Sequence, residues 1–571
     1  MAGGNEIVVR FAGEGGQGVV TAAEMLARAA TGVGYHALTF ATFPSQILGG
    51  PTWTQARVSR FPVHSPGDTV DVLIAFNDYA YQEHRSDVRK GGVILLDPAV
   101  TPDPSDTDHR CVIVPFDQLA KQTGESRAAN MVVMGGLSRL IEMPIQFFKD
   151  FVAARFAGRE GVVEANHTAL DLGLNHLADE EPIANLTAPN LPDYDQLFIK
   201  GNEAISIGAI HAGIDTYIGY PISPATPILV YLERNLIGEG KVAIQASSEI
   251  ESITGILGAS FAGKKAMTAT SGPGFTLMAE GIGLGWMAEV PIVVVDVQRG
   301  GPATGLPTKT EQSDLLTAIT PAHGDSRMPV IAPGTVEECF YASVMAFNWA
   351  ERYQGPVMLL SEHSLAERAQ NIPRPNLSQV PVEDRDAYTG NNGYRRYEAK
   401  GISPIPIPGK PGAYVANGSE HDIYGDTTHR PSYHVHMTER RFSKLKLLED
   451  GDYEAHNVNS KIVLMPWGGS KGSVLECYEA LKSEGVDLGW YYTMFVSPLP
   501  AKMLEELKSK DLVIVPELNY QGQMASVLRS LGVKAEAITQ YTGLPFRADE
   551  LAGRIKQLLV VEGERTGALK A

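Results

Sequence analysis

Short apolar runs, separated by stretches with helical periodicity, dominate the pattern of hydrophobic and polar positions along this chain. In the first part of the sequence such runs occupy residues 7–12, 70–75, 92–97 and 111–115. A continuous apolar run of this length is typical of a strand that is buried on both faces. Because the runs alternate with helical stretches, we predict an α/β fold built on parallel or mixed sheets.

The same alternation recurs farther along the chain, and changes in composition suggest the domain limits. Residues 1–190 form a first domain that ends in a linker rich in proline and acidic residues, and residues 191–372 form a second domain. Residues 373–459 lack apolar periodicity and are expected to be a long irregular connecting segment; such segments are usually functional or linkers. Residues 460–571 again alternate strands and helices and form a C-terminal α/β domain.

Composition narrows the functions that the chain can have. Its 571 residues are too many for a single hydrophobic core, so several domains are expected. Its net charge of −18 lacks the excess of Lys and Arg that is typical of nucleic-acid binding. Its three cysteines, Cys111, Cys339 and Cys477, lie far apart, which suits a reducing cytoplasm and does not supply the four thiolates of a [4Fe–4S] cluster. No apolar run approaches the ~20 residues that span a bilayer, so we expect no membrane association.

Turns rich in glycine, proline and hydroxyl residues follow or open the predicted strands of the second domain. They occupy residues 220–226, 247–251, 270–274 and 298–308. In an α/β sheet, ligands bind in the crevice beyond the carboxyl ends of the strands, so these turns predict one shared pocket. The charged and hydroxyl side chains that would meet there are Glu249, Arg299, Ser223, Thr226, Thr304 and Thr308.

The two charged residues of this predicted pocket each have a simpler structural explanation. Ser248-x-x-Glu251 is a capping box, so Glu249 and Glu251 could both serve the start of a helix. Arg299 follows an apolar strand in a Gly/Pro-rich turn, where its planar fork suits bidentate binding of a carboxylate. Alternatively, Arg299 is a solvated residue at the rim.

A second candidate site lies near the N-terminus. Gly13-x-Gly15-x-x-Gly18 follows a predicted strand and opens a predicted helix, which is the context in which glycines let a phosphate approach the backbone. Residues 34–41 offer no acid for the ribose of NAD, which argues against a classical dinucleotide site. The alternative is a plain tight turn between strand and helix.

Together these segments resemble the thiamine-diphosphate-dependent 2-oxoacid:ferredoxin oxidoreductases over nearly the full chain. Tyr220-Pro-Ile-Ser-Pro is similar to the Tyr-Pro-Ile-Thr-Pro of that family, and residues 298–308 resemble its 2-oxoacid carboxylate site. Residues 13–18, 49–54 and 130–136 resemble its γ domain, and residues 517–523 resemble a turn of its C-terminal domain. The chain thus looks like an α subunit with the γ domain fused in front, followed by a pyrimidine-binding domain and a transketolase C-terminal-like domain.

The resemblance implies a role for each motif. Glu249 would be the catalytic carboxylate, because a carboxylate bonded to the pyrimidine N1′ of thiamine diphosphate promotes deprotonation of the thiazolium C2. The other residues implied to contact thiamine diphosphate are Tyr220, Pro221 and Ile222. Those implied to bind the 2-oxo acid are Ser223, Arg299 and Thr308. Those implied to bind coenzyme A are Gly13, Gly15, Gly16, Gln17 and Gly18.

The chain lacks the Gly-Asp-Gly motif with which the family binds the diphosphate. The resemblance therefore implies a β subunit that holds Mg²⁺, the diphosphate site and a [4Fe–4S] cluster, in an (αβ)₂ assembly, with no metal bound by this chain. The implied reaction is the reversible, CoA-dependent oxidative decarboxylation of 2-oxoglutarate to succinyl-CoA and CO₂, with ferredoxin as electron acceptor.

Other functions remain open from the sequence. Pyruvate or a branched-chain 2-oxo acid could replace 2-oxoglutarate, and the chain could instead be a non-catalytic nucleotide-binding module. A dicarboxylate needs a second cation or hydrogen-bond donor, for which Arg57, Lys309 and the histidines of residues 373–459 are candidates. His434-x-His436 alone is too few ligands to predict a metal site.

Overall fold

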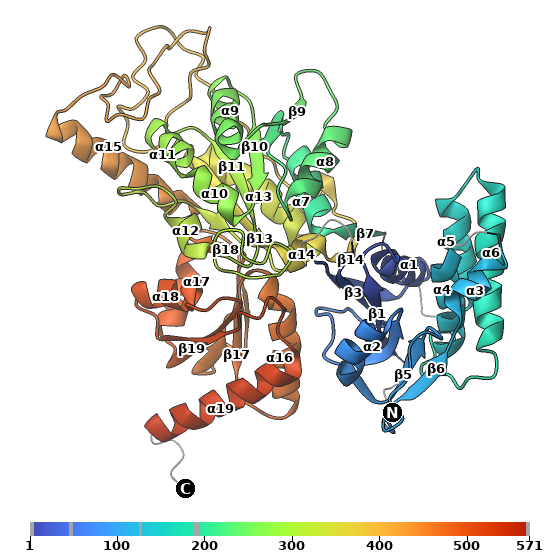
Figure 1. Ribbon diagram of the computed structural model, residues 1–571. Coiled ribbons are helices and arrows are strands. Elements are labelled where there is room, and N and C mark those ends of the chain that lie inside the picture. The colour runs from blue at the N-terminus through green and yellow to red at the C-terminus, as the bar shows by residue number, and fades with distance from the viewer. Residues whose placement is uncertain (1–4, 45–48, 125–127, 188–194, 567–571) are drawn as a thin grey trace. The chain divides into compact units, whose positions relative to one another are not determined.

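The computed structural model describes residues 5–44, 49–124, 128–187 and 195–566 (Figure 1). The chain forms two compact units. The first comprises residues 1–199 and 367–374, and the second comprises residues 200–366 and 375–571. Both combine helices with sheets, so the α/β fold class expected from the apolar runs is confirmed. Among the described residues, no helix is long and apolar enough to cross a membrane.

The first unit is built on an eight-stranded mixed sheet with strand order β6-β5-β4-β1-β3-β2-β14-β7. Strands β1, β4, β5 and β6 are parallel neighbours, whereas β3 pairs antiparallel with both β1 and β2. The strands are β1 (Glu6–Glu14), β2 (His36–Thr42), β3 (Pro51–Ser59), β4 (Val70–Ala75), β5 (Val88–Leu96), β6 (Arg110–Ile113), β7 (Gln196–Lys200) and β14 (Ala369–Pro373).

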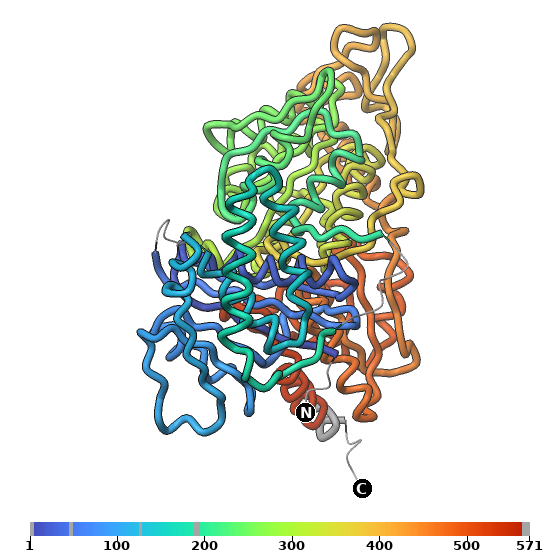
Figure 2. The backbone as a smooth tube through the Cα atoms, turned by 90° about the vertical axis from the view of Figure 1, so that its right-hand side faces the viewer, coloured from blue at the N-terminus to red at the C-terminus, as the bar shows by residue number. Residues whose placement is uncertain are grey.

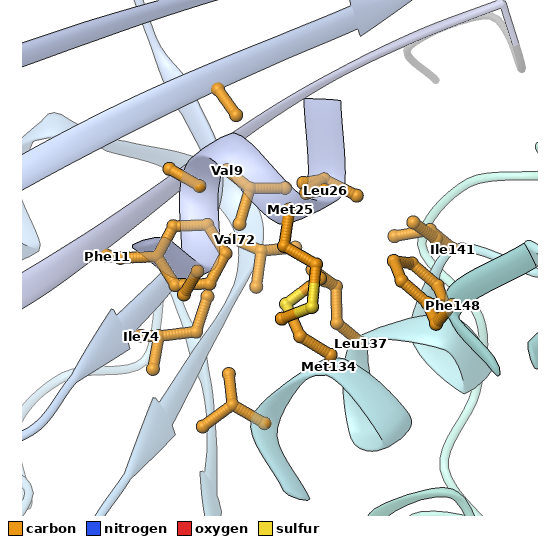
Figure 3. Packing of buried hydrophobic residues seen from close by; sticks show 14 of the residues in the cluster. Val9, Phe11, Met25, Leu26, Val72, Ile74, Met134, Leu137, Ile141 and Phe148 are labelled. Carbon is orange, nitrogen blue, oxygen red and sulfur yellow. The ribbon is translucent and has the colours of Figure 1, made fainter. Parts of the chain in front are cut away.

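Helices of this unit pack on the sheet through a dense apolar core. They are α1 (Val19–Thr31), α2 (Asp78–His84), α3 (Phe116–Lys121), α4 (Ala129–Leu140), α5 (Ile145–Arg155) and α6 (Glu160–His176). Figure 3 shows Val9, Phe11 and Ile74 of the strands facing Met25 of α1 and Met134 of α4. Helix α1 is rich in alanine, which favours helix and lets the helix lie close to the sheet.

Strand β14 reaches the first unit from far along the sequence. It pairs antiparallel with β2, and the amide of Asn371 accepts a hydrogen bond from Ala37 N–H at 2.8 Å through its Oδ1. Residues 367–374 therefore belong to a different compact unit from residues 200–366, which precede them in the chain. Such long-range pairing leaves no trace in local periodicity.

The second unit contains a seven-stranded sheet of order β18-β12-β13-β11-β10-β8-β9 and a five-stranded sheet of order β15-β17-β16-β19-β20. The larger sheet is parallel except at β18, which the C-terminal part of the chain adds antiparallel to β12. Its strands are β8 (Thr216–Gly219), β9 (Val242–Gln245), β10 (Ala266–Thr270), β11 (Ile292–Gln298), β12 (Val330–Ile331), β13 (Pro356–Glu362) and β18 (Phe495–Ser497). Those of the smaller sheet are β15 (Glu454–His456), β16 (Ile462–Leu464), β17 (Gly489–Tyr492), β19 (Leu512–Glu517) and β20 (Ala535–Thr539).

Helices connect these strands in the alternating manner that parallel sheets require. Those around the larger sheet are α7 (Gly201–His211), α8 (Thr226–Asn235), α9 (Glu249–Phe261), α10 (Gly272–Leu277), α11 (Ala279–Ala288), α12 (Leu315–Ile319), α13 (Val336–Tyr353) and α14 (His363–Glu367). Those around the smaller sheet are α16 (Lys471–Ser483), α17 (Ala501–Lys508), α18 (Gln523–Ser530) and α19 (Ala548–Thr566).

The segment 373–459, whose sequence gives no apolar period, runs as loops from residue 380 to residue 430 and then forms a helix (Figure 2). This helix, α15 (Pro431–Ser443), buries Met437, Arg440 and Arg441. Because two of its three buried residues are arginines, its inner face looks polar in the sequence. A search for apolar periodicity therefore misses it.

A buried ion cluster holds this segment to the larger sheet's helices. Glu289, just after α11, is fully buried, and its carboxylate accepts hydrogen bonds from Arg440 Nε and Lys444 Nζ, each at 2.8 Å. These two cations hold the pKa of the Glu289 carboxyl well below its usual range, against the effect of burial. All the partners lie in the interior, so the cluster is stable only while it is complete.

We expect Glu289→Gln to lower the free energy of unfolding by about 3–5 kcal/mol, because it leaves two buried cations without their counter-charge. The measurement is the denaturant midpoint for the second unit. Glu280→Gln, an exposed position of the same helix, is the matched control and should change stability by less than about 0.5 kcal/mol. Equal midpoints for the two variants would contradict this account of the cluster.

Candidate active site

The turn after β8 and the loop after β11 meet through the backbone. The Ser223–Pro224 peptide bond is cis, and the Ser223 carbonyl accepts a hydrogen bond from Arg299 Nη1 at 2.7 Å. Ser223 is itself exposed, and the Thr226 hydroxyl donates to the Ile222 carbonyl within the turn. The turn therefore positions Arg299 with a carbonyl group, not with the hydroxyls that the sequence singles out.

Arg299 is a buried cation that is held mainly by neutral groups. Only 8% of its surface is exposed, and its second contact is a long one from Nη2 to the Thr304 carbonyl at 3.5 Å. Its Nε is buried without a hydrogen-bond partner, and within the described parts of the chain it forms no ion pair. Burial lowers the pKa of the guanidinium, and the nearby carboxyl groups of Asp296 and Asp314 partly offset this decrease. The guanidinium thus keeps donor capacity for an anionic ligand.

The loop 299–309 folds back on itself beside Arg299. The N–H of Gly300 donates to the Lys309 carbonyl at 3.0 Å, and Leu306 N–H donates to the Gly300 carbonyl at 2.8 Å. Thr308 is half-buried and lies on the returning arm of this loop. The fold therefore gives Thr308 and Arg299 a common support.

The candidate catalytic residue Glu249 and its neighbour Glu251 have different surroundings. Ser248 Oγ caps α9 by accepting the N–H of Glu251 at 3.1 Å, and the exposed Glu251 carboxylate accepts the N–H and the hydroxyl of Ser247 at 2.7 and 2.6 Å. The predicted capping box thus forms only in part. The Ser248 hydroxyl oxygen accepts the Glu251 N–H as expected, but the Glu251 carboxylate bonds to Ser247 and not to the N–H of Ser248. Glu249 is 6% exposed, and in the described ranges no group hydrogen-bonds its carboxylate.

Helix α10 connects this carboxylate to the surroundings of Arg299. A Cβ added at Gly274 would lie 2.5 Å from Glu249 Oε1 and 2.1 Å from Thr270 Oγ1, and one at Gly272 would lie 3.0 Å from Asp314 Oδ2. Helices α9 and α10 and strand β11 lie side by side (Figure 1). The glycines of α10 therefore let the backbone lie directly against two carboxyl groups.

Three acids near Arg299 are absent from the sequence-based list of candidates. Asp296 is fully buried on β11, where it pairs in register with Thr270, and Glu311 and Asp314 lie on the chain before α12. Burial raises the pKa of all three carboxyl groups, that of Asp314 to about 6. The signal for Asp296 was an acid inside the otherwise apolar run of residues 292–297.

A cavity of 790 Å³ opens at this edge of the sheet. Arg299, Glu311 and Asp314 line it together with α10 and the start of α18. Tyr520 and Tyr541, which are exposed and stack edge to face at 5.1 Å between ring centroids, also contribute to its wall. The cavity is large enough for a small organic anion.

Tyr220, Pro221 and Ile222 lie after β8, beside the strand that leads to Glu249. Strands β8 and β9 are parallel neighbours, and Ala246 N–H donates to the Gly219 carbonyl at 2.9 Å. Tyr220 is 40% exposed, whereas Pro221 and Ile222 are half-buried. These residues and Glu249 therefore share the carboxyl edge of two adjacent strands.

The glycine turn of the first unit lines a separate cavity of 390 Å³. Gly16 and Gly18 have φ of 101° and 73°, and Gly15 N–H donates to the Gly50 carbonyl at 3.1 Å. A Cβ at Gly13 would lie 2.4 Å from Gln17 Oε1, which accepts the N–H of Glu14. The turn leads into α1, whose N-terminus has no side-chain cap.

The residues that could bind the second carboxylate of a dicarboxylate differ in whether they already have a partner. Arg57 pairs with Glu6 at 3.0 Å, His434 pairs with Glu420, and His436 contacts the Tyr397 carbonyl. Lys309 is half-buried, which lowers its pKa, and it forms no ion pair among the residues with described positions. In those same residues, no three His, Cys, Asp or Glu side chains gather as a metal site.

Two family models match the chain. The model described as pyruvate flavodoxin/ferredoxin oxidoreductase, thiamine diP-bdg, matches residues 207–440, and the model described as pyruvate ferredoxin/flavodoxin oxidoreductase matches residues 8–176.

Full-length relatives carry related names. The chain is 31% identical to the 2-oxoglutarate oxidoreductase subunit KorA of Mycobacterium tuberculosis, over 97% of this chain and 92% of that protein. It is 30% identical to subunit alpha of the 2-oxoacid:ferredoxin oxidoreductase 2 of Aeropyrum pernix, over 98% and 99%. Its structure is similar, with a TM-score of 0.91 and 36% identity over 97% and 99%, to the 2-oxoglutarate:ferredoxin oxidoreductase from Magnetococcus marinus with 2-oxoglutarate, coenzyme A and succinyl-CoA bound.

We expect Gly274→Ala to destabilise the second unit by about 1–3 kcal/mol, because the new methyl group would overlap Glu249 and Thr270. Denaturant unfolding measures the change. Gly258→Ala on α9, where an added Cβ meets nothing within 4 Å, is the control and should be neutral or stabilising by up to about 1 kcal/mol. A Gly274→Ala protein as stable as the control would show that α10 does not press on Glu249.

Proposed function

The chain belongs to the alpha subunits of the 2-oxoacid:ferredoxin oxidoreductases, and we propose that it binds thiamine diphosphate and 2-oxoglutarate in a CoA-dependent oxidative decarboxylase. The observation that carries the proposal is the buried Glu249 carboxylate, which lies against a glycine backbone and lacks a hydrogen-bond partner within the described chain. A carboxylate without a hydrogen-bond partner keeps its acceptor capacity for a ligand.

The surroundings of Glu249 fit the pyrimidine of thiamine diphosphate. A buried carboxylate is the acceptor that the pyrimidine N1′ requires, and the region that matches the thiamine-diphosphate model contains Glu249. Tyr220, Pro221 and Ile222 would border the cofactor from the neighbouring strand end. When bound, thiamine diphosphate supplies the carbon nucleophile and electron sink for decarboxylation. Glu249 would hold the proton at N1′ on which this chemistry depends.

Arg299 is the proposed partner of the substrate's 1-carboxylate. Backbone carbonyls hold its guanidinium in place, so its remaining N–H groups can form a bidentate pair. Ser223 and Thr308 would add hydroxyl contacts from the two arms that flank it. The protein from Magnetococcus marinus holds 2-oxoglutarate, which favours this substrate over pyruvate or a branched-chain 2-oxo acid. Lys309 is the cation on the same loop that we propose for the distal carboxylate.

Coenzyme A is the proposed ligand of residues 13–18. The left-handed Gly16 and Gly18 and the uncapped start of α1 present backbone N–H groups to the 390 Å³ cavity, as a phosphate site requires. We assign residues 1–190 to the γ domain, 191–372 to the pyrimidine-binding domain, and 460–571 to the C-terminal domain, with 373–459 between them.

A β subunit is the proposed partner, in an (αβ)₂ assembly that passes electrons to ferredoxin. It would supply the diphosphate site with Mg²⁺ and the [4Fe–4S] cluster. Apolar side chains support this proposal, because Val242 and Ile244 of the edge strand β9 and Ile250 of α9 are exposed, Ile250 by 56%. Exposed apolar residues along a sheet edge mark a surface that another chain covers.

Glu249→Gln should abolish 2-oxoglutarate-dependent turnover and leave the fold intact, because an amide cannot replace the carboxylate at N1′. Dye reduction by the reconstituted αβ complex with thiamine diphosphate and CoA is the measurement. Glu251→Gln removes the same charge two residues away, from an exposed site, and should retain most of the activity. The opposite pattern would move the catalytic role to Glu251, and full activity of both would remove it from this helix.

Gly16→Val should raise the KM for CoA by at least about tenfold, since it blocks backbone approach to a phosphate. Cluster reduction in a single turnover without CoA should persist. Gly158→Val is the matched control, because Gly158 also has a positive φ, of 81°, and open space around its Cβ. An unchanged KM would place CoA elsewhere, and an equal loss in both variants would show general backbone strain.

A further inference from the structure

Carboxyl groups surround the arginine that we assign to the 2-oxo acid, although acids oppose the binding of an anion. Glu311 and Asp314 line the cavity with Arg299, and Asp296 lies fully buried on the strand that leads to it. Both carboxyl oxygens of Asp296 and Oδ2 of Asp314 are buried without a hydrogen-bond partner within the described residues. Because no carboxylate of the described ranges is ion-paired with Arg299, this arrangement is not a set of ordinary salt bridges.

Hydrogen bonds anchor the backbone of Asp314 at the cavity wall. Its N–H donates to Gln298 Oε1 at 3.0 Å, and Gln298 Nε2 donates to the Ser361 carbonyl at 3.0 Å, so two buried strands hold it. On its other side, Gly272 of α10 lies so close that an added Cβ would be 3.0 Å from Oδ2. The backbone that carries the carboxyl is therefore anchored at the cavity wall, and Oδ2 lies against the backbone of α10.

The charges that act on Asp314 come from few groups. The ionisable side chains that line the same cavity are those of Arg299, Glu311, Tyr520 and Tyr541. Asp296 is the other buried acid nearby, and the helices α10 and α12 carry no ionisable side chain. Burial and Glu311 raise the pKa of Asp314 to about 6, whereas Arg299 opposes the rise. Burial and Asp314 raise the pKa of the Asp296 carboxyl well above its ordinary value. Asp314 lines the cavity with Arg299, which Asp296 does not, and its pKa of about 6 lies close to neutral pH, so its charge can change there.

We propose that Asp314 takes up a proton from solvent when the 2-oxo acid binds at Arg299, so that substrate binding and protonation are coupled. The inference rests on the proposed function. The incoming carboxylate adds a negative charge beside Asp314 in a poorly solvated cavity, and a like charge favours the protonated acid. Asp314 changes from an anion that repels the ligand into a neutral hydrogen-bond donor.

The coupling fixes the direction of the pH dependence. Below a pH of about 6, Asp314 is already protonated in the free protein, and affinity does not change through this group. Above that pH the proton has to be taken up on binding, so affinity falls as pH rises, by up to roughly tenfold per pH unit. The fall ends where pH exceeds the pKa of Asp314 in the complex.

Calorimetric titration of the αβ complex, loaded with thiamine diphosphate and without CoA, tests the proposal. The probe is N-oxalylglycine, a 2-oxoglutarate analogue with an unreactive amide carbonyl. Titrations at pH 7 in phosphate and in Tris, which differ in ionisation enthalpy, give the number of protons exchanged. We expect wild type to take up about half to one proton. Asp314→Asn should take up almost none and, at pH 8, should bind the probe roughly tenfold more tightly than wild type.

Matched variants identify the titrating group. Asp296→Asn should keep the proton uptake, since Asp296 does not line the cavity that the ligand enters, and Asp325→Asn should keep it because this acid is exposed. The proposal is overturned if wild type binds the probe without taking up a proton, or if Asp314→Asn keeps the uptake. A distinct result tests the proposed function: Arg299→Lys should weaken binding roughly 10- to 100-fold. Equal affinity of Arg299→Lys and wild type would refute the site itself, whatever the protons do.

Discussion

Charge that is removed from water at the carboxyl edge of the large parallel sheet is the constraint on which the site depends. Strands β10 and β11 end there with Thr270 and Asp296 in register, and Arg299 follows directly. An isolated buried ion costs several kcal/mol or more, so each group must be paired, neutralised or held ready for a ligand. Carbonyl groups from two turns hold Arg299, and burial raises the pKa of the Asp296 carboxyl.

The same unit contains a buried ion cluster with the opposite character. Glu289, Arg440 and Lys444 satisfy one another at short distances and are almost completely enclosed. Around Arg299, by contrast, Arg299 Nε, both carboxyl oxygens of Asp296 and Oδ2 of Asp314 are buried without partners in the part of the chain that the structure describes. The first arrangement joins two segments of the fold, whereas the second is typical of a site that a ligand completes. The two clusters also differ in charge, because one carboxylate faces two cations in the first and three carboxyl groups lie near one cation in the second.

The sequence predicts those elements whose pattern of apolar residues follows from their own burial. The apolar runs 7–12 and 70–75 correspond to β1 and β4, because a strand buried on both faces is apolar throughout. The apolar pattern of the sequence does not predict helix α15, because the buried face of this helix is largely arginine. It does not place β14 in the first unit either, because the strand that β14 pairs with is distant in sequence. Motif resemblance located Glu249 and Arg299, whose roles stay predictions. The acids Asp296 and Asp314 matter through a three-dimensional neighbourhood that no spacing rule encodes.

The exposed apolar residues and the carboxylate that suit a partner and a ligand lie in one region of the second unit. Exposed apolar residues of β9 and α9 lie beside Glu249, which follows the same strand and whose carboxylate has no hydrogen-bond partner among the described residues. Exposed apolar surface is unfavourable in water, and an unpartnered carboxylate keeps its acceptor capacity for a donor. A partner that covers this edge and a cofactor that bonds Glu249 would use both features together. Because a ligand that binds the native state stabilises it by mass action, assembly, cofactor binding and folding stability of this chain are thermodynamically linked.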